Sequence, residues 1–222
     1  MRPLRLLITR PLPAGAVTAA RLRAQGHDVT LAPLMATEAA AWDRPDHLPD
    51  AVMLTSAFAA RLAGPGTAAL RHLPVFAIGG ATARAAQEAG FIDVRAAGGT
   101  AQALLDAVAA AGITSIVHLA GEDRTPVVVP AGLTVDTLTV YRARLVPLAT
   151  LPIVDWVLLY SPRSAAHFAA EAERLGVARS RVNVAAISAA TLAFAGDGWR
   201  TTVVASEPTE DALLAAIGIS CH

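Results

Sequence analysis

Lysine is missing from this sequence of 222 residues, and all 18 basic residues are arginine. Without lysine the chain cannot form a Schiff base with pyridoxal phosphate or with a carbonyl substrate. It also cannot form a phosphate-binding P-loop, which requires a Gly-Lys-Ser/Thr sequence. Composition therefore excludes these two classes of chemistry.

The sequence also has a single cysteine and no net charge. Cys221 is the only cysteine, which excludes a disulfide framework and a thiolate metal cage. The six histidines show no paired ligand spacing, so we expect no metal site. The formal net charge is zero, so no overall field attracts nucleic acid, and we expect no nucleic-acid partner.

Long apolar runs are absent as well. No run approaches the roughly 18 residues of a membrane-spanning helix. The apolar stretch near the start is interrupted by Thr9 and Arg10 and is too short for a signal peptide. We therefore expect no membrane partner and a cytoplasmic location.

The chain does contain many short apolar runs of strand length, separated by alanine-rich segments of helical length. The expected strands are 4–9, 28–33, 51–56, 74–79, 93–97, 115–120, 133–141, 154–160, 181–187 and 201–206. Short apolar strands that alternate with helices predict an α/β fold with parallel sheets covered on both faces. Two sheets of about five strands fit the usual size better than one sheet of ten.

The two halves of the chain resemble each other. Ile78 and Ile187, Thr82 and Thr191, and Thr100 and Thr209 are each 109 residues apart. This offset is too long for a solenoid repeat and predicts two copies of one α/β domain. The N-terminal strands also resemble a later segment of the chain weakly. This similarity predicts a discontinuous domain (1–33 with 149–222) and an inserted domain (38–140). Residues 34–37 and 141–148 are then inter-domain linkers.

Small polar residues follow the ends of many expected strands, where parallel α/β sheets bind ligands. Arginines near the same ends could bind carboxylates in a bidentate manner. The candidate ligand-binding residues are Thr9, Arg10, Thr55, Ser56, Gly79, Thr82, Gly121, Arg124, Ser161, Arg163, Ser164, Ser188 and Thr191. Helix capping explains any single hydroxyl, and solvation any single arginine, equally well. Matched turns in both halves favour a ligand site.

Eight segments occur in the order and spacing of uroporphyrinogen-III synthase, and the chain resembles that family over nearly its whole length. They are LLITRP, LTSAFA, FAIGGATA, LAGEDR, TVYRA, LLYSPRSA, AAISAAT and ASEPTEDALLAAI. The sequence departs from the family pattern at Ser188, where glycine is usual, and at Ala57 and Phe58, where many relatives have Pro-Arg.

The resemblance implies two HemD-like, flavodoxin-like α/β halves joined by a two-stranded β-ladder. It implies a cofactor-free hydro-lyase that cyclises hydroxymethylbilane to uroporphyrinogen III with inversion of ring D and loss of water. It also implies that Tyr141, in TVYRA, faces the substrate, either as a hydrogen-bond donor to the departing hydroxyl or as an interface residue. We expect a monomer.

Two rival interpretations remain at this point. One is a cytosolic two-domain module that binds a small molecule without changing it. The other is a regulatory homologue of the synthase that has lost catalysis. Only the enzyme would release a product different from its substrate.

Overall fold

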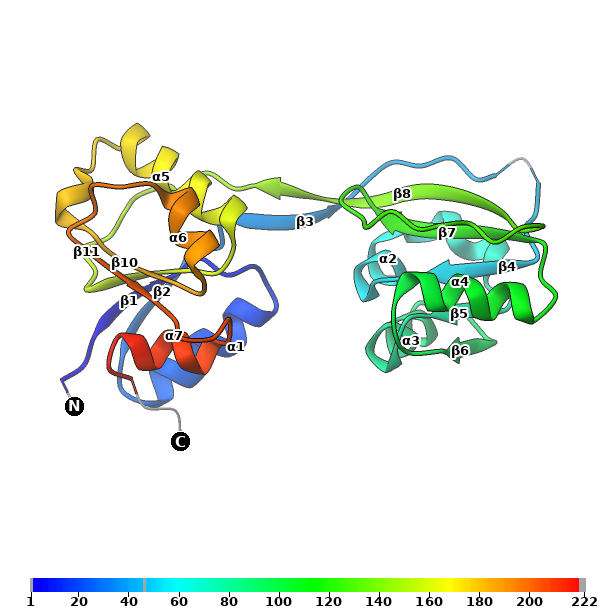
Figure 1. Ribbon diagram of the computed structural model, residues 1–222, viewed down its shortest axis with the longest axis horizontal. Helices are drawn as coiled ribbons and strands as arrows, with labels where there is room; N and C mark the ends of the chain where they lie inside the picture. The colour runs from blue at the N-terminus through cyan, green and yellow to red at the C-terminus, as the bar shows by residue number, and fades with distance from the viewer. Residues whose placement is uncertain (1, 46, 220–222) are drawn as a thin grey trace. The chain divides into compact units, whose positions relative to one another are not determined.

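The chain folds into two compact units, described here from a computed structural model that covers residues 2–45 and 47–219 (Figure 1). Unit 1 combines Met1–Ala36 with Arg144–His222, and unit 2 comprises Thr37–Ala143. The chain therefore passes between the units twice, once in each direction.

Unit 1 contains a five-stranded sheet in the order β11-β10-β9-β1-β2, with every pair parallel. Its strands are β1 (Arg5–Ile8), β2 (Asp28–Leu31), β9 (Trp156–Leu159), β10 (Asn183–Ala186) and β11 (Thr201–Val204). Two segments more than a hundred residues apart in the chain thus form one sheet, with β1 beside β9.

Unit 2 contains a six-stranded sheet in the order β3-β8-β7-β4-β5-β6. Its strands are β3 (Met35–Ala39), β4 (Ala51–Leu54), β5 (Val75–Ala77), β6 (Val94–Ala96), β7 (Ser115–Gly121) and β8 (Thr134–Leu145). The five strands from β8 to β6 are joined by parallel pairs. The expectation of an α/β fold with parallel sheets is confirmed.

Helices cover both faces of each sheet. In unit 1 they are α1 (Ala14–Ala24), α5 (Pro162–Arg174), α6 (Ala189–Ala195) and α7 (Glu210–Ala216), with a 3₁₀ turn η2 (Arg179–Arg181). In unit 2 they are α2 (Ala57–Leu62), α3 (Gly80–Glu88) and α4 (Ala101–Ala110), with a 3₁₀ segment η1 (Gly64–Leu70).

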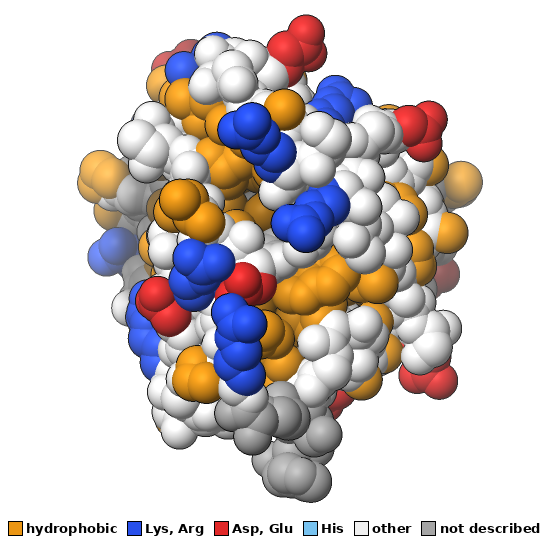
Figure 2. Space-filling model, turned by 90° about the vertical axis from the view of Figure 1, so that its left-hand side faces the viewer, with side chains coloured by type: hydrophobic (Ala, Val, Ile, Leu, Met, Phe, Trp, Pro, Cys, Tyr) orange, Lys and Arg blue, Asp and Glu red, His pale blue; other side chains and the backbone are white. Residues whose placement is uncertain are grey.

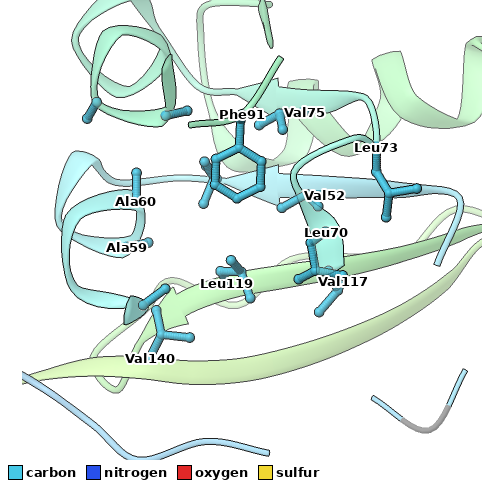
Figure 3. Packing of buried hydrophobic residues seen from close by; sticks show 14 residues of the cluster. Val52, Ala59, Ala60, Leu70, Leu73, Val75, Phe91, Val117, Leu119 and Val140 are labelled. Atoms are coloured by element: carbon cyan, nitrogen blue, oxygen red, sulfur yellow. The ribbon is translucent and has the colours of Figure 1, made fainter. Parts of the chain in front are cut away.

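Each face has its own apolar core, because strands buried on both sides alternate their side chains between two layers. In unit 2, Val52 and Leu119 pack with residues of α2 and α3, such as Ala60 (Figure 3). Met53 points to the other layer, where it packs with Leu105 of α4. Unit 1 repeats this arrangement, with α5 and α6 on one face and α1 and α7 on the other.

Strands β3 and β8 run side by side in opposite directions. The amide of Ala40 donates to the carbonyl of Val140 (2.9 Å), and the amide of Val146 donates to the carbonyl of Leu34 (2.9 Å). Of the eleven strands that the structure describes, ten lie at the ten sites expected from the sequence, shortened or lengthened by a few residues at their ends. The eleventh strand, β3, matches none of the ten expected runs and occupies most of the first expected linker, 34–37, for which the family resemblance implied one strand of a two-stranded ladder.

Candidate functional site

Unit 2 contains a cavity of about 640 Å³ near the carboxyl ends of β4, β5 and β7. Parallel strands place their carboxyl ends at one edge of a sheet, which is why residues distant in sequence meet there. The cavity is lined by Thr55, Ser56, Ile78, Thr100, Ala101, Gln102, His118, Gly121, Asp123, Arg124, Thr125, Pro126, Val127 and Tyr141. Five of the expected site residues, Thr55, Ser56, Gly121, Arg124 and Tyr141, are therefore brought together.

A β-bulge directs Tyr141 toward this cavity. Ala120 pairs with Thr139, but the next residue, Gly121, pairs with Tyr141, so Val140 is an extra residue in β8. As a result Val140 and Tyr141, although adjacent, both pack against the same apolar core. A bulge of this kind re-aims a side chain at the edge of a site.

Gly121 makes room for the tyrosine. A Cβ atom at this position would lie 2.6 Å from Cζ of Tyr141 and 2.8 Å from its hydroxyl oxygen. The ring of Phe58 is tilted by 43° to that of Tyr141, with the two centroids 6.0 Å apart. The Tyr141 ring thus contacts a glycine and an aromatic ring, and its hydroxyl makes no hydrogen bond to any residue that the structure describes.

Arg124 lines the cavity and is held there by the end of β7 and by β8. Its Nη1 donates to the carbonyl of Gly121 (3.0 Å) and lies 3.3 Å from Oγ1 of Thr139. The other guanidinium nitrogens make no hydrogen bond within the described part of the chain, so they can bind a carboxylate of a ligand. From the sequence alone, Arg124 could equally be a ligand-binding residue or a solvated surface residue.

His118 was not singled out by sequence reasoning, and the structure places it in the wall of the cavity. It lies on β7 with only 6% of its surface exposed, and its Nε2 is 2.9 Å from Oγ1 of Thr55. Burial, followed by the positive charge of Arg124, lowers the pKa of His118 to about 4. The imidazole is therefore neutral at neutral pH.

The corresponding edge of unit 1 carries two matched hydroxyl pairs at helix starts. Ser161 caps α5 by accepting from the amide of Ser164 (3.2 Å), and Ser188 caps α6 by accepting from the amide of Thr191 (3.1 Å). In each pair the two hydroxyls also bond to each other, at 2.9 Å and 3.0 Å. Capping thus occupies these hydroxyls, while Ser161 and Ser188 remain partly exposed at the strand ends.

Arg10 belongs to a charged cluster on unit 1. It forms an ion pair with Glu210 (2.9 Å), whose carboxylate also accepts from Arg21 and from the hydroxyl of Thr18. The Arg10 guanidinium lies over the ring of Tyr160, 5.4 Å from its centroid. Burial, followed by the negative charge of Glu210, raises the pKa of Tyr160.

The remaining expected residues have less access to a ligand. Thr9 is fully buried and donates its hydroxyl to the carbonyl of Leu158 (2.6 Å), while Thr82 is 5% exposed. Gly79 caps α3 with extended backbone and does not line the cavity, and Arg163 is exposed in the first turn of α5.

One face of unit 1 carries charges of both signs (Figure 2). On the face of unit 1 drawn in Figure 2, arginine side chains alternate with apolar, acidic and uncharged polar groups. Among residues 2–45 and 47–219, no three His, Cys, Asp or Glu side chains lie close enough to hold a metal ion together. Within the same residues no helix is long and apolar enough to cross a membrane.

Comparison with solved structures gives matches that include the following two. A uroporphyrinogen-III synthetase from Helicobacter pylori is 16% identical, with a TM-score of 0.58 and 97% of each chain covered. A mutant uroporphyrinogen III synthase from Thermus thermophilus is 18% identical, with a TM-score of 0.48, 97% of this chain covered and 96% of that one. A search of curated proteins found no match.

The match to a family model extends over most of the chain. The Helicobacter pylori structure, at 16% identity and a TM-score of 0.58, shows a common fold but not a common activity. The family model described as uroporphyrinogen-III synthase HemD, however, matches residues 16–215, which include all of unit 2, most of unit 1 and every cavity residue named above. The chain therefore belongs to the HemD uroporphyrinogen-III synthase family.

Proposed function

We propose that this chain cyclises hydroxymethylbilane to uroporphyrinogen III, with loss of water and inversion of ring D. Family membership makes it a lyase enzyme of haem biosynthesis, and the match across residues 16–215 is the observation that carries the assignment. It also disfavours a binding module that leaves its ligand unchanged.

The unit 2 cavity fits one part of such a substrate. A linear tetrapyrrole of this type carries eight carboxylates, and the cavity offers the hydroxyls of Thr55 and Ser56 together with the unoccupied nitrogens of Arg124. Arg124 is a stronger candidate for a carboxylate than Arg10, because Arg10 is already paired with Glu210. On unit 1, the proposed binding residues are Ser161, Ser188 and Arg163.

Tyr141 is the proposed donor to the departing hydroxyl. The pyrrole nitrogen pushes electrons toward the carbon that loses the hydroxyl, so the leaving oxygen needs only a hydrogen bond or a proton from a weak acid. The free Tyr141 hydroxyl at the cavity can supply that bond. Ring D then attacks through its substituted carbon, the resulting spiro intermediate reopens, and the macrocycle closes as the type III isomer.

Most of the rate would come from positioning, because the substrate must fold so that ring D attacks through the more crowded carbon. No residue of this chain need form a covalent bond to the substrate for the reaction to proceed. The chain's hydroxyls, arginines and backbone amides therefore serve orientation, and Tyr141 alone serves the leaving group.

The architecture is proposed in finer terms as well. If the strands of unit 1 are numbered along the chain, their order in the sheet is 2-1-3-4-5, which is the flavodoxin-like order. In unit 2, β8-β7-β4-β5-β6 has the same arrangement, except that the first of these strands in the chain, β4, occupies the third position of that order. We propose two flavodoxin-like domains, divided near residues 36 and 143, with the β3–β8 ladder as their linker. A monomer in the cytosol remains a prediction.

The test is to supply hydroxymethylbilane to the purified chain without added metal or cofactor, oxidise the products and separate them by chromatography. We expect the type III isomer in clear excess over a protein-free blank. If only the type I isomer forms, at the rate of the blank, the proposed function is wrong.

A further inference from the structure

His118 occupies a sheet position whose equivalent in unit 1 holds an apolar side chain. Ser56 and Ser161 cap equivalent helices, so β4 and β9 are equivalent strands. The neighbour of Met53 on β7 is His118, and the neighbour of Leu158 on β1 is Ile8. The place of His118 is thus taken in unit 1 by a fully buried isoleucine.

A buried imidazole in this position needs a reason beyond packing. An unpaired polar group in an apolar layer costs free energy, so sheets retain one where it has a specific partner. Among the residues that the structure describes, the side-chain partner of His118 is the hydroxyl of Thr55, at 2.9 Å from Nε2, and both side chains line the unit 2 cavity. The His118–Thr55 hydrogen bond therefore joins a buried side chain of the sheet to a hydroxyl at the cavity wall.

We infer that His118 is a positioning residue: its Nε2–H donates to Oγ1 of Thr55 and so directs the threonine O–H into the cavity, where it donates to a carboxylate of the tetrapyrrole. This inference rests on the proposed function and names the group that orders one of its binding contacts.

The direction of the bond follows from the ligand's chemistry. A threonine hydroxyl has one hydrogen, and a carboxylate can only accept. If Thr55 gave its hydrogen to the imidazole, it would present only lone pairs to the cavity and would repel a carboxylate. With the imidazole as donor, the threonine O–H and the free nitrogens of Arg124 both offer donors to the same kind of group.

A double-mutant cycle measures this coupling. The probe is uroporphyrin III, the oxidised octacarboxylate, and the readouts are its dissociation constant and the KM and kcat for hydroxymethylbilane. Thr55→Val should weaken binding of the probe roughly tenfold, the usual effect of losing one hydrogen bond to a charged group. His118→Ile, which copies the equivalent residue of unit 1, should weaken it about fivefold and raise KM more than it lowers kcat.

Two further variants separate positioning from packing. His118→Gln keeps a side-chain N–H donor and should recover binding to within about twofold of the unaltered chain. In the Thr55→Val background, His118→Ile should change the dissociation constant by less than about twofold, since its partner is gone. Equal effects of His118→Ile in both backgrounds, or no rescue by His118→Gln, would overturn the inference.

Matched controls guard against general destabilisation. Thr67 is a buried threonine of unit 2 whose hydroxyl donates to Gly64 (2.8 Å), and His27 is a buried histidine of unit 1 that accepts from the amide of Leu4 (3.2 Å). Neither lines the cavity. Thr67→Val and His27→Gln should lower the unfolding midpoint without weakening probe binding, and a comparable loss of binding in them would also count against His118.

The two proposals fail separately. If the unaltered chain forms no type III isomer but binds uroporphyrin III with the expected pattern of variants, the reaction is wrong and the positioning role stands. If it forms the type III isomer and the cycle shows no coupling, the reaction stands and the positioning role is wrong.

Discussion

Tyr141 contributes one hydroxyl to the proposed chemistry, and its removal tests how much acid catalysis matters. A well-placed general acid is typically worth roughly 10²–10⁴-fold, and a leaving group already driven by a pyrrole needs less. We expect Tyr141→Phe to bind uroporphyrin III normally, to lose about tenfold to a hundredfold in kcat, and still to form the type III isomer. Unchanged turnover would make Tyr141 a packing residue, and complete loss with intact binding would mean that acid catalysis dominates.

Gly121 sets the position of that tyrosine. Because a methyl group at Gly121 would overlap the ring and hydroxyl of Tyr141, Gly121→Ala should displace the ring and lower kcat at least as much as Tyr141→Phe does. Gly80→Ala is the matched control, since a methyl group there meets nothing closer than 3.7 Å. Steady-state kinetics of both variants check this, and wild-type turnover in Gly121→Ala would contradict the geometry described.

At this scale the sequence predicted which hydroxyls and glycines follow strand ends, because turn and cap chemistry is local. It missed His118, since one histidine in an apolar run resembles an ordinary buried residue until the strand register shows Ile8 in its place. It also could not predict that Arg10 is paired with Glu210, because the two lie 200 positions apart in the chain. Contacts of that range depend on the tertiary fold.

Among the elements, α5 fixes the returning chain to unit 1. Glu171, on its buried face, accepts from the amide of Leu148 (2.6 Å) and from Arg174 (2.7 Å), while Arg174 donates to the carbonyl of Leu148 (2.6 Å). His167 of the same helix lies 2.8 Å from the carbonyl of Val146. One helix thus holds both backbone groups of Leu148 immediately after β8 ends.

This anchor makes stability depend on pH. The hydrogen bond from Arg174, aided by that from Leu148, lowers the pKa of Glu171 to about 2 from its usual 4.5. A carboxyl whose pKa is lower in the folded state stabilises it fully above about pH 4.5, and the contribution is lost as the pH falls toward about 2. Glu171→Gln should lower the free energy of unfolding by about 1–3 kcal/mol at pH 7.

Denaturant unfolding of both proteins at several pH values checks this. The difference between them should shrink steadily from pH 4.5 downward, because the carboxyl of the unaltered protein becomes protonated. A difference that stays constant over that range would show that Glu171 acts by packing alone.

One strand, β3, could not be predicted from its own sequence. Ten strands were predicted from local apolar runs, and β3 was not, because MATEA is only partly buried and has no strong alternation. Its pairing with β8, which extends to Leu145, is what makes it a strand. Partner-dependent strands of this kind are the least visible in a single sequence.

Over the whole molecule, the division into units predicts how fragments behave. Residues 37–143 contain all of unit 2 with its two apolar cores, so this fragment should unfold cooperatively on its own. A fragment of residues 1–110 lacks β7 and β9, the strands beside β4 and β1, as well as β8, and should not unfold cooperatively. Circular dichroism during thermal denaturation distinguishes them, and a cooperative transition in 1–110 would contradict the proposed domains.

The sheet order of unit 1 also determines how long its N-terminal strands wait for their partner during synthesis on the ribosome. Strand β2 ends at Leu31, but β9, the other neighbour of β1 in the sheet, begins at Trp156, which is 125 residues later. At about 5–20 residues per second the nascent N-terminal segment waits about 6–25 s for its partner. All of unit 2 is translated during that wait. Strands β1 and β2 therefore leave the ribosome long before their partner β9, and we expect a chaperone that binds apolar nascent segments to bind them during that interval.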